Sequence, residues 1–211
     1  MGGLFDIEGP VVSFFERLAD LVILNLIFMI CCLPVITIGA SVTALSAITQ
    51  KMSRKEEGYI VRGFFRAFKE NFLQATAIWL ILMVLSSVWV VDMRFLGNLG
   101  GGIQMAFLCL LFILGFLCFF EFIYAFPLLA KFNNTTINTM KNALLLALRY
   151  LPRTGVLILL NVLPLLAGYM FLQFGIPFYL IMGFSVISLA CSHVLKKIFD
   201  PLIKEGEENG G

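Results

Sequence analysis

The sequence predicts an all-α membrane protein: a polytopic bundle of five transmembrane helices with two amphipathic cytoplasmic elbow helices. The first observation is composition, because the 211 residues are 60% hydrophobic and 13% charged, whereas soluble globular chains are about 45–50% apolar and about 25% charged. The second is that long stretches carry no charge, and about 20 apolar residues cross a bilayer as a helix. Soluble enzymes, disordered chains and disulfide-stapled secreted domains are therefore excluded as classes.

The five spans follow from the uncharged stretches. The first stretch, 21–50, is longer than a bilayer requires, so we expect a kink or break around Pro34. The last stretch, 154–195, holds two spans, and Gly175 and Pro177 favour a turn between them. The predicted spans are 18–38, 73–91, 103–128, 154–172 and 177–195, within a single transmembrane domain, 1–211, that ends in a flexible tail over 200–211.

Two segments between spans have the pattern of amphipathic helices. In the elbow predicted over 58–71, Ile60, Phe64 and Phe68 recur every four residues, with cationic side chains on the other side. The elbow predicted over 135–150 likewise separates leucines from polar residues. Such helices lie in the inner membrane interface and turn their cationic face toward headgroups or a partner protein. The candidate docking or headgroup contacts are Arg62, Arg66, Lys69, Lys141 and Arg149.

Positive charge is distributed unevenly between the two sides of these spans. Of the 15 Lys and Arg residues, 13 fall in the segments 51–70, 131–153 and 196–204, and 2 fall in the N-terminal segment and the 92–102 loop. Short cationic loops stay on the cytoplasmic side of a membrane. The sequence therefore predicts a multi-pass protein with its N-terminus outside and its C-terminus inside.

One carboxylate, Glu121, lies inside a predicted span. An ionisable group at that depth is costly and is a candidate functional residue. Asn161 falls at comparable depth in the fourth span, and Ser185 and Ser188 of the fifth span could join it, so these four residues form a candidate polar intramembrane cluster. Two interpretations stay open: hydrogen bonds that hold the helices together, or a site for a ligand, proton or ion.

Motifs of the common catalytic classes are missing. The sequence has no GxxxxGK[ST] phosphate-binding loop, and its only histidine, His193, cannot form a two-histidine zinc motif. The five cysteines lie in predicted spans without CxxC spacing, a pattern typical of apolar packing residues. We therefore predict no enzyme, with no catalytic residue, cofactor or metal, and the net charge of +2 gives no indication of nucleic-acid binding.

Five blocks of sequence resemble the YesL-like family of bacterial integral membrane proteins, a domain of unknown function. They are MGGLF at 1–5, RLAD at 17–20, CCLPVITIGAS at 31–41, GFFRAFKEN at 63–71, and KNALLLAL at 141–148 followed by LPRT at 151–154. The resemblance implies the bacterial cell membrane as location. Members are often encoded beside carbohydrate ABC importers, glycan-degrading enzymes and two-component sensors, so it also implies a sugar-uptake context. It supplies no catalytic or binding residues.

Three functions fit these features. The first is an accessory or permease-like component of carbohydrate uptake, the second a membrane partner of a two-component sensor, and the third a small-solute transporter that uses Glu121. Besides the lipid bilayer, the expected partners are ABC-transporter subunits or a sensor kinase. Nucleic acid is not among them.

Overall fold

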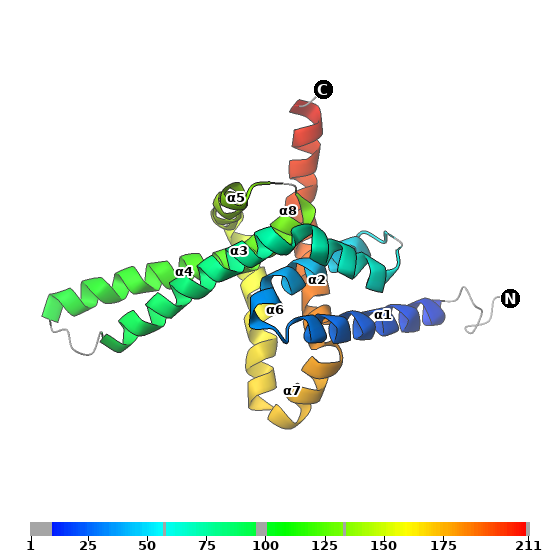
Figure 1. Ribbon diagram of the computed structural model, residues 1–211, viewed down its shortest axis with the longest axis horizontal. Helices are drawn as coiled ribbons and strands as arrows, with labels where there is room; N and C mark the ends of the chain where they lie inside the picture. The colour runs from blue at the N-terminus through cyan, green and yellow to red at the C-terminus, as the bar shows by residue number, and fades with distance from the viewer. Residues whose placement is uncertain (1–9, 57, 96–100, 133, 210–211) are drawn as a thin grey trace.

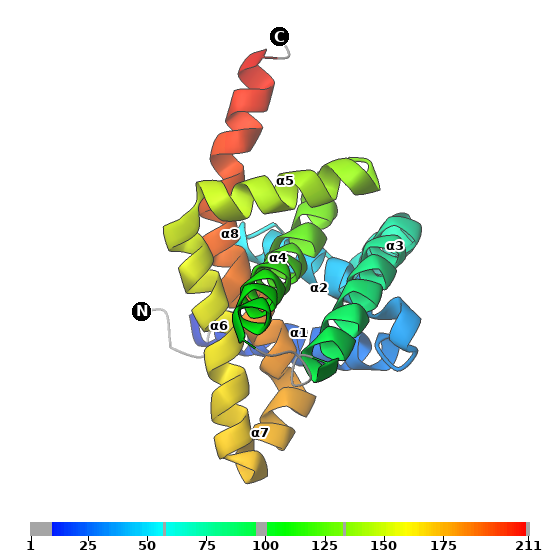
Figure 2. The same cartoon turned by 90° about the vertical axis from the view of Figure 1, so that its left-hand side faces the viewer.

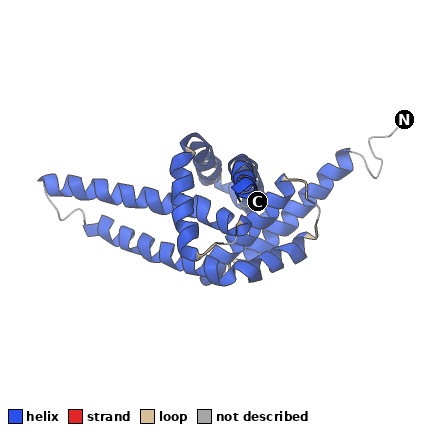
Figure 3. Ribbon diagram, turned by 90° about the horizontal axis from the view of Figure 1, so that it is seen from above, coloured by secondary structure: helices blue, strands red, loops and turns tan. Residues whose placement is uncertain are grey.

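The computed structural model describes residues 10–56, 58–95, 101–132 and 134–209, and these segments are helical with short connections (Figure 3). The all-α prediction is confirmed for this part of the chain. The elements are α1 (Pro10–Cys31), a 3-10 turn (Val35–Thr37), α2 (Ile38–Ser53), α3 (Ile60–Phe95), α4 (Gly101–Lys131), α5 (Thr136–Arg149), α6 (Leu151–Met170), α7 (Leu172–Phe178), a π-helical turn (Tyr179–Gly183) and α8 (Phe184–Asn209).

In the described part of the chain, four helical segments are long and apolar enough to cross a membrane. They are Ile60–Phe95, Gln104–Lys131, Leu151–Met170 and Gly175–Ile203. Each one coincides with one of the last four predicted spans, although the helical ends differ by several residues. The fold therefore supports an integral, multi-pass membrane protein.

The first predicted span, 18–38, does not exist as one helix. α1 ends at Cys31, and Pro34 follows in an extended conformation with φ −76° and ψ 119°. Proline has no N–H to continue a helical ladder, so the expected break around Pro34 is confirmed. α1 also carries Glu16, Arg17 and Asp20 within its 22 residues. Three charges would be costly in hydrocarbon, and α1 is not among the four spanning segments.

The elbow predicted over 58–71 is not a separate helix either. α3 runs from Ile60 to Phe95 without a break, because no glycine or proline follows Gly63 in this range to end it. The apolar face of its first turns is also covered by protein: Phe64 is fully buried and packs in a cluster with Leu24 and Ile48. These turns therefore anchor α3 on α1 and α2.

A separate helix does occupy the range of the second elbow, 135–150. α5 ends at Arg149, and Tyr150 leaves the helical conformation with φ −115° and ψ 44° just before Pro152 in the first turn of α6. A proline is favoured there because the first N–H groups of a helix have no intrahelical partner. The position of α5 at a membrane interface stays a prediction.

The chain turns between the last two predicted spans, but the helix breaks at Phe171, and Gly175 and Pro177 lie within the short helix α7. α6 ends at Met170, α7 begins at Leu172, and the chain reverses direction (Figure 2). At Gly175 a Cβ atom would lie 2.5 Å from the carbonyl oxygen of Gly168. Only glycine permits this approach of the two backbones without a shift.

Helix α8 extends beyond the last predicted span. It passes through Pro201 and ends at Asn209, so the described part of the 200–211 tail is helical, and residues 210 and 211 lie outside the described residues. Pro201 cannot donate to the carbonyl of Lys197, four residues earlier. The guanidinium of Arg153 on α6 donates to this carbonyl instead, at 2.9 Å.

The four spanning segments do not run side by side. Figures 1 and 2 show the α3–α4 hairpin extending across the direction of α6 and α8, with α2 at the junction of the two pairs. α2 packs against α1, α3, α4 and α8. The predicted helix bundle therefore takes the form of two crossing hairpins that the short central helix α2 holds together.

Candidate functional site

The central helix α2 is unusual in being both polar and buried. Its buried polar residues are Ser41, Thr43, Ser46, Thr49, Gln50 and Ser53. Most of their hydroxyl groups bond to carbonyls of the same helix or of the turn just before it, as in the 2.9 Å bond from Thr43 to Gly39 and the 2.8 Å bond from Ser53 to Gln50. A hydroxyl satisfied in this way needs no water, so the helix can lie in the interior.

Thr49 connects α2 to α8. Its hydroxyl lies 2.9 Å from the hydroxyl of Ser188 and 2.9 Å from that of Ser192, and it donates to the carbonyl of Leu45. Ser188 and Ser192 are four residues apart, so both lie on the face of α8 that meets α2. Three hydroxyl groups from two helices therefore meet in the interior.

We expect Thr49→Val to lower the thermal midpoint (Tm) of the detergent-solubilised protein. Valine keeps the shape of threonine but leaves two serine hydroxyls without this partner, and a buried polar group that loses its bond costs about 1–3 kcal/mol. Thr43→Val is the matched control, since Thr43 is also buried in α2 but bonds only to Gly39 of its own helix. Equal shifts in Tm for the two variants would show that the bonds to α8 contribute nothing.

A cavity of about 330 Å³ adjoins these hydroxyl groups. Helices α2, α4, α6 and α8 form most of its wall, and Phe28 of α1 also contributes. The polar residues in its lining are Ser46, Asn161, Ser188, Cys191 and Ser192, and none of its lining residues is charged. Its volume is near the lower end of the range for ligand pockets, about 300–1,000 Å³.

Two amides, those of Asn161 and Gln50, lie in or beside this cavity, and the acceptor of Gln50 is unused among the described residues. The side-chain nitrogen of Asn161 donates to the carbonyl of Leu157 at 2.8 Å and to the sulfur of Cys191 at 3.3 Å. Gln50 donates to the carbonyl of Pro127, a lining residue, at 2.9 Å, whereas its Oε1 atom is buried without a partner in the described part of the chain. A buried acceptor without a partner is a place where a water or a ligand hydroxyl would bind.

The predicted cluster of Glu121, Asn161, Ser185 and Ser188 is only partly brought together. Asn161 and Ser188 both line the cavity. Ser185 instead donates to the carbonyl of Leu21 at 2.8 Å, which fastens α1 to α8. Glu121 is 9% exposed, its Oε2 atom is buried without a hydrogen-bond partner among the described residues, and it does not line the cavity.

The predicted cationic contacts are all exposed. Arg62, Arg66 and Lys69 lie on the first turns of α3, where Arg66 forms an ion pair with Glu70 at 2.9 Å. Lys141 and Arg149 lie on α5. These side chains are available to headgroups or to a partner protein, and their role stays a prediction.

The residues that sequence analysis missed are those of the second half of α2. Thr49 and Gln50 follow the small-residue run of the 31–41 block. Ser46 and Thr49 are three residues apart, and Ser188 and Ser192 are four apart, so each pair shares a helix face. That spacing was a usable signal, but only the tertiary structure shows that the two faces meet.

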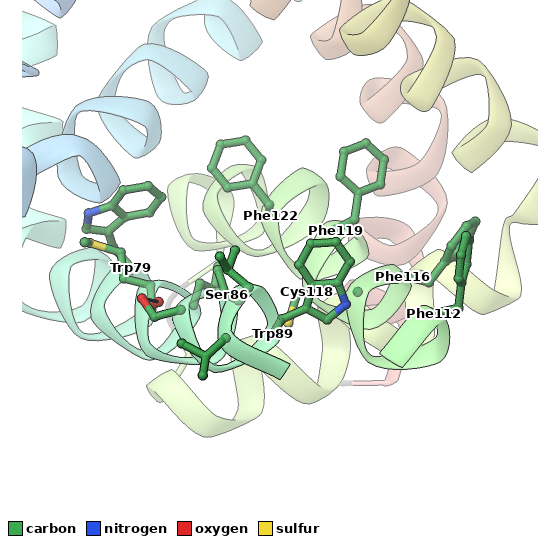
Figure 4. Close-up of a pocket in the computed structure, with 14 residues that line it drawn as sticks. Trp79, Ser86, Trp89, Phe112, Phe116, Cys118, Phe119 and Phe122 are labelled. Carbon is green, nitrogen blue, oxygen red and sulfur yellow. Dashed lines mark hydrogen bonds between the residues drawn. The ribbon is translucent and has the colours of Figure 1, made fainter. Parts of the chain in front are cut away.

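A second and larger cavity, about 1,000 Å³, lies between α3 and α4. Figure 4 shows the indole rings of Trp79 and Trp89 and the phenylalanine rings of α4 around it. The Trp89 nitrogen donates across the hairpin to the carbonyl of Leu111 at 2.8 Å and is thereby satisfied. This aromatic cavity is lined by two helices only. We place the candidate site at the smaller cavity because an amide, a thiol and hydroxyl groups from α2, α6 and α8 converge there.

Residues 21–93 match the sequence model of a family described as a protein of unknown function, DUF624. The match confirms the family resemblance over the part of the chain that contains the second half of α1, all of α2 and nearly all of α3. It includes the 31–41 and 63–71 blocks. Comparison with curated proteins and with solved structures found no match.

Proposed function

We propose that this integral membrane protein takes part in carbohydrate uptake as an accessory or permease-like component, and that its central cavity binds an uncharged, hydroxylated solute. One observation carries the proposal. The cavity presents hydroxyl, amide and thiol groups from three helices, and its lining contains no charged side chain.

An uncharged solute suits this lining for an electrostatic reason. An ion taken into the interior of a membrane protein needs a counter-charge or many aligned dipoles, because its desolvation is otherwise too costly. Hydroxyl groups and amides both donate and accept hydrogen bonds, as the hydroxyl groups of a sugar do. A cavity of about 330 Å³ leaves room for a single sugar ring and not for a long glycan.

The family resemblance supports the carbohydrate-uptake part of this proposal. It implies a bacterial cell-membrane protein encoded near carbohydrate importers. In this proposal the basic segments 51–70, 131–153 and 196–204 are cytoplasmic, as the charge distribution favours. The prediction that the N-terminus lies outside depended on a first crossing at 18–38, and α1 is not one of the spanning segments.

Binding of neutral monosaccharides to the purified protein tests the cavity directly. We expect at least one sugar of a panel to raise Tm and to bind in calorimetry, and we expect Asn161→Leu and Ser46→Ala each to weaken that binding about tenfold. Asn142→Leu is the control, because Asn142 is exposed on α5, away from the cavity. If no neutral sugar binds, or if charged solutes bind in its place, the proposed solute class is wrong.

Co-purification from native membranes tests the proposed role. Recovery of ABC-transporter subunits with the tagged protein supports the accessory function, and impaired growth on glycans after gene deletion is expected with it. Recovery of a sensor kinase without transporter subunits would instead support the role of a sensor partner and contradict the uptake proposal.

One observation favours the third function, a small-solute transporter that uses Glu121. A buried carboxylate oxygen without a partner is costly when ionised, and Glu121 has such an atom. On this alternative, reconstituted protein without partners takes up solute, and Glu121→Gln abolishes the uptake. Uptake that is unchanged in Glu121→Gln would remove this alternative.

A further inference from the structure

We propose that the seam between the start of α6 and the middle of α8 binds the phosphate headgroup of an anionic membrane lipid. The ligands are the cationic side chains of Arg149, Arg153 and Lys197. This site lies at the end of the molecule where α5 joins α6 beside α8 (Figure 2) and involves none of the residues that line the central cavity.

The two guanidinium groups are held by a shared aromatic ring. The Cζ atoms of Arg149 and Arg153 lie 5.6 and 5.3 Å from the centre of the Tyr150 ring. Guanidinium groups at such distances are attracted to the ring by its quadrupole. Tyr150 occupies the junction of α5 and α6, where its non-helical conformation gives both arginines access to it.

Arg153 is also fixed to α8 through the backbone of Lys197, so Lys197 is the residue of α8 that adjoins Arg153. Its Nη1 atom donates at 2.9 Å to the carbonyl of Lys197, the carbonyl that Pro201 leaves without a helical donor. A guanidinium has five N–H groups, so this bond leaves several free for phosphate oxygens. Arg149 and Arg153 are therefore held in place before a ligand binds, which lowers the entropy cost of binding.

The positive charge of this seam is not neutralised by the protein. The ion pairs in the described part of the chain are Arg54 with Asp200 and Arg66 with Glu70, so none of the three seam cations has an acidic partner there. Asp200, the acidic residue nearest to Lys197 in sequence, forms an ion pair with Arg54 at 2.7 Å. These three cations are therefore free to pair with an external anion.

The surroundings favour a lipid over a soluble phosphate as the source of that anion. The seam lies at the start of one spanning segment, Leu151–Met170, and within another, Gly175–Ile203. Leu148, Leu151 and Val156 expose 52%, 57% and 45% of their surface beside it. A lipid can place its phosphate on the cations and its acyl chain on this apolar surface, and basic pockets between spanning helices bind anionic headgroups in this way.

Lipid binding to the purified full-length protein tests the proposal. In native mass spectrometry and thermal-shift measurements, we expect phosphatidylglycerol to bind in preference to phosphatidylcholine and to raise Tm. The double variant R149Q/K197Q should weaken phosphatidylglycerol binding at least tenfold, since each cation near a membrane surface contributes about fivefold. Neither side chain donates a hydrogen bond in the described structure, and R149Q removes only the contact with the Tyr150 ring, which is worth about 0.5–1 kcal/mol. Tm without lipid should therefore fall only slightly.

The double variant K51Q/K55Q is the matched control. It removes the same charge from two exposed lysines on the same predicted side of the membrane, and phosphatidylglycerol binding should be unchanged. Equal loss in both double variants would show a general charge effect and overturn the site, as would unchanged binding in R149Q/K197Q. If glycerol 3-phosphate competes as well as the intact lipid, the ligand is a soluble phosphate and the lipid assignment is wrong.

Discussion

Gly39→Ala is expected to reduce sharply both the Tm of the detergent-solubilised protein and its level in the membrane. A Cβ atom at position 39 would lie 2.5 Å from the carbonyl oxygen of Ala75 and 2.7 Å from the Cβ of Trp79. Neither atom is the mobile end of a side chain, so α2 and α3 would have to move apart. Overpacking of this kind costs about 1–3 kcal/mol.

The position of Trp79 adds to the expected effect. Its indole nitrogen donates at 2.8 Å to the carbonyl of Val35, in the turn that precedes α2. Movement of α3 away from Gly39 would stretch this bond as well. The packing of α2 on the α3–α4 hairpin is thus sensitive to one methyl group, because the contact is between backbones.

Gly155→Ala provides the comparison for this prediction. Gly155 is also helical, but no heavy atom lies within 4 Å of the Cβ atom that alanine would add. Alanine is favoured over glycine in a helix by about 1 kcal/mol, so Tm should stay unchanged or rise slightly. A Tm for Gly39→Ala as high as that of Gly155→Ala would mean that the close approach of α2 and α3 is not required for stability.

Asn25→Leu is expected to produce the second large loss of stability. The side chain of Asn25 is fully buried and donates to the carbonyls of Tyr179 and Leu180 at 3.0 and 2.9 Å. Its oxygen accepts from the backbone N–H of Ser185 at 3.2 Å. These bonds satisfy the π-helical turn between α7 and α8, whose hydrogen bonding departs from the regular ladder.

Leucine fills a similar volume but can replace none of these bonds. Each buried polar group left without a partner costs about 1–3 kcal/mol, so we expect a total loss of about 3 kcal/mol in the free energy of unfolding. Detachment of α1 from α8 should appear as increased proteolysis within residues 10–31. Denaturation in mixed micelles and limited proteolysis are the measurements.

Asn71→Leu is the control for Asn25→Leu. The amide of Asn71 donates at 2.9 Å to Ala67 of its own helix, so its loss affects no contact between helices. We expect a change well under 1 kcal/mol for this variant. If Asn25→Leu is equally mild, then apolar packing around Leu24 and Phe28, together with the bond from Ser185 to Leu21, is sufficient to hold α1.

The sequence by itself determined the chemical class and most of the helix positions. Whether a helix is stable in the bilayer interior depends on its composition and on the length of its apolar stretch. The local sequence was therefore enough to locate the spans at 73–91, 103–128, 154–172 and 177–195. The break near Pro34 was also local, because proline acts through its own backbone. The resemblance to a family of unknown function rested on blocks such as 31–41 and was confirmed over residues 21–93.

Predictions from the sequence were wrong for segments whose structure depends on packing against other helices. The apolar face at Phe64 has the same pattern whether it meets lipid or protein, and only the fold shows that it packs on Leu24 and Ile48. α3 continued through the predicted elbow because nothing local ended it. A flexible tail was expected after residue 200, yet α8 continues past Pro201, where Arg153 of another helix supplies the missing donor.

The tertiary structure alone decided where the polar groups meet. Asn161, Ser188 and Ser46 lie on three different helices, and their convergence on one cavity depends on how α2 fits between the two hairpins. Glu121 was predicted to belong to the same cluster because it is a carboxylate inside a predicted span, at a depth comparable to that of Asn161. It does not line that cavity. Periodicity gives the faces of each helix, but hydrogen bonds across helices depend on packing, and here small residues such as Gly39 set that packing.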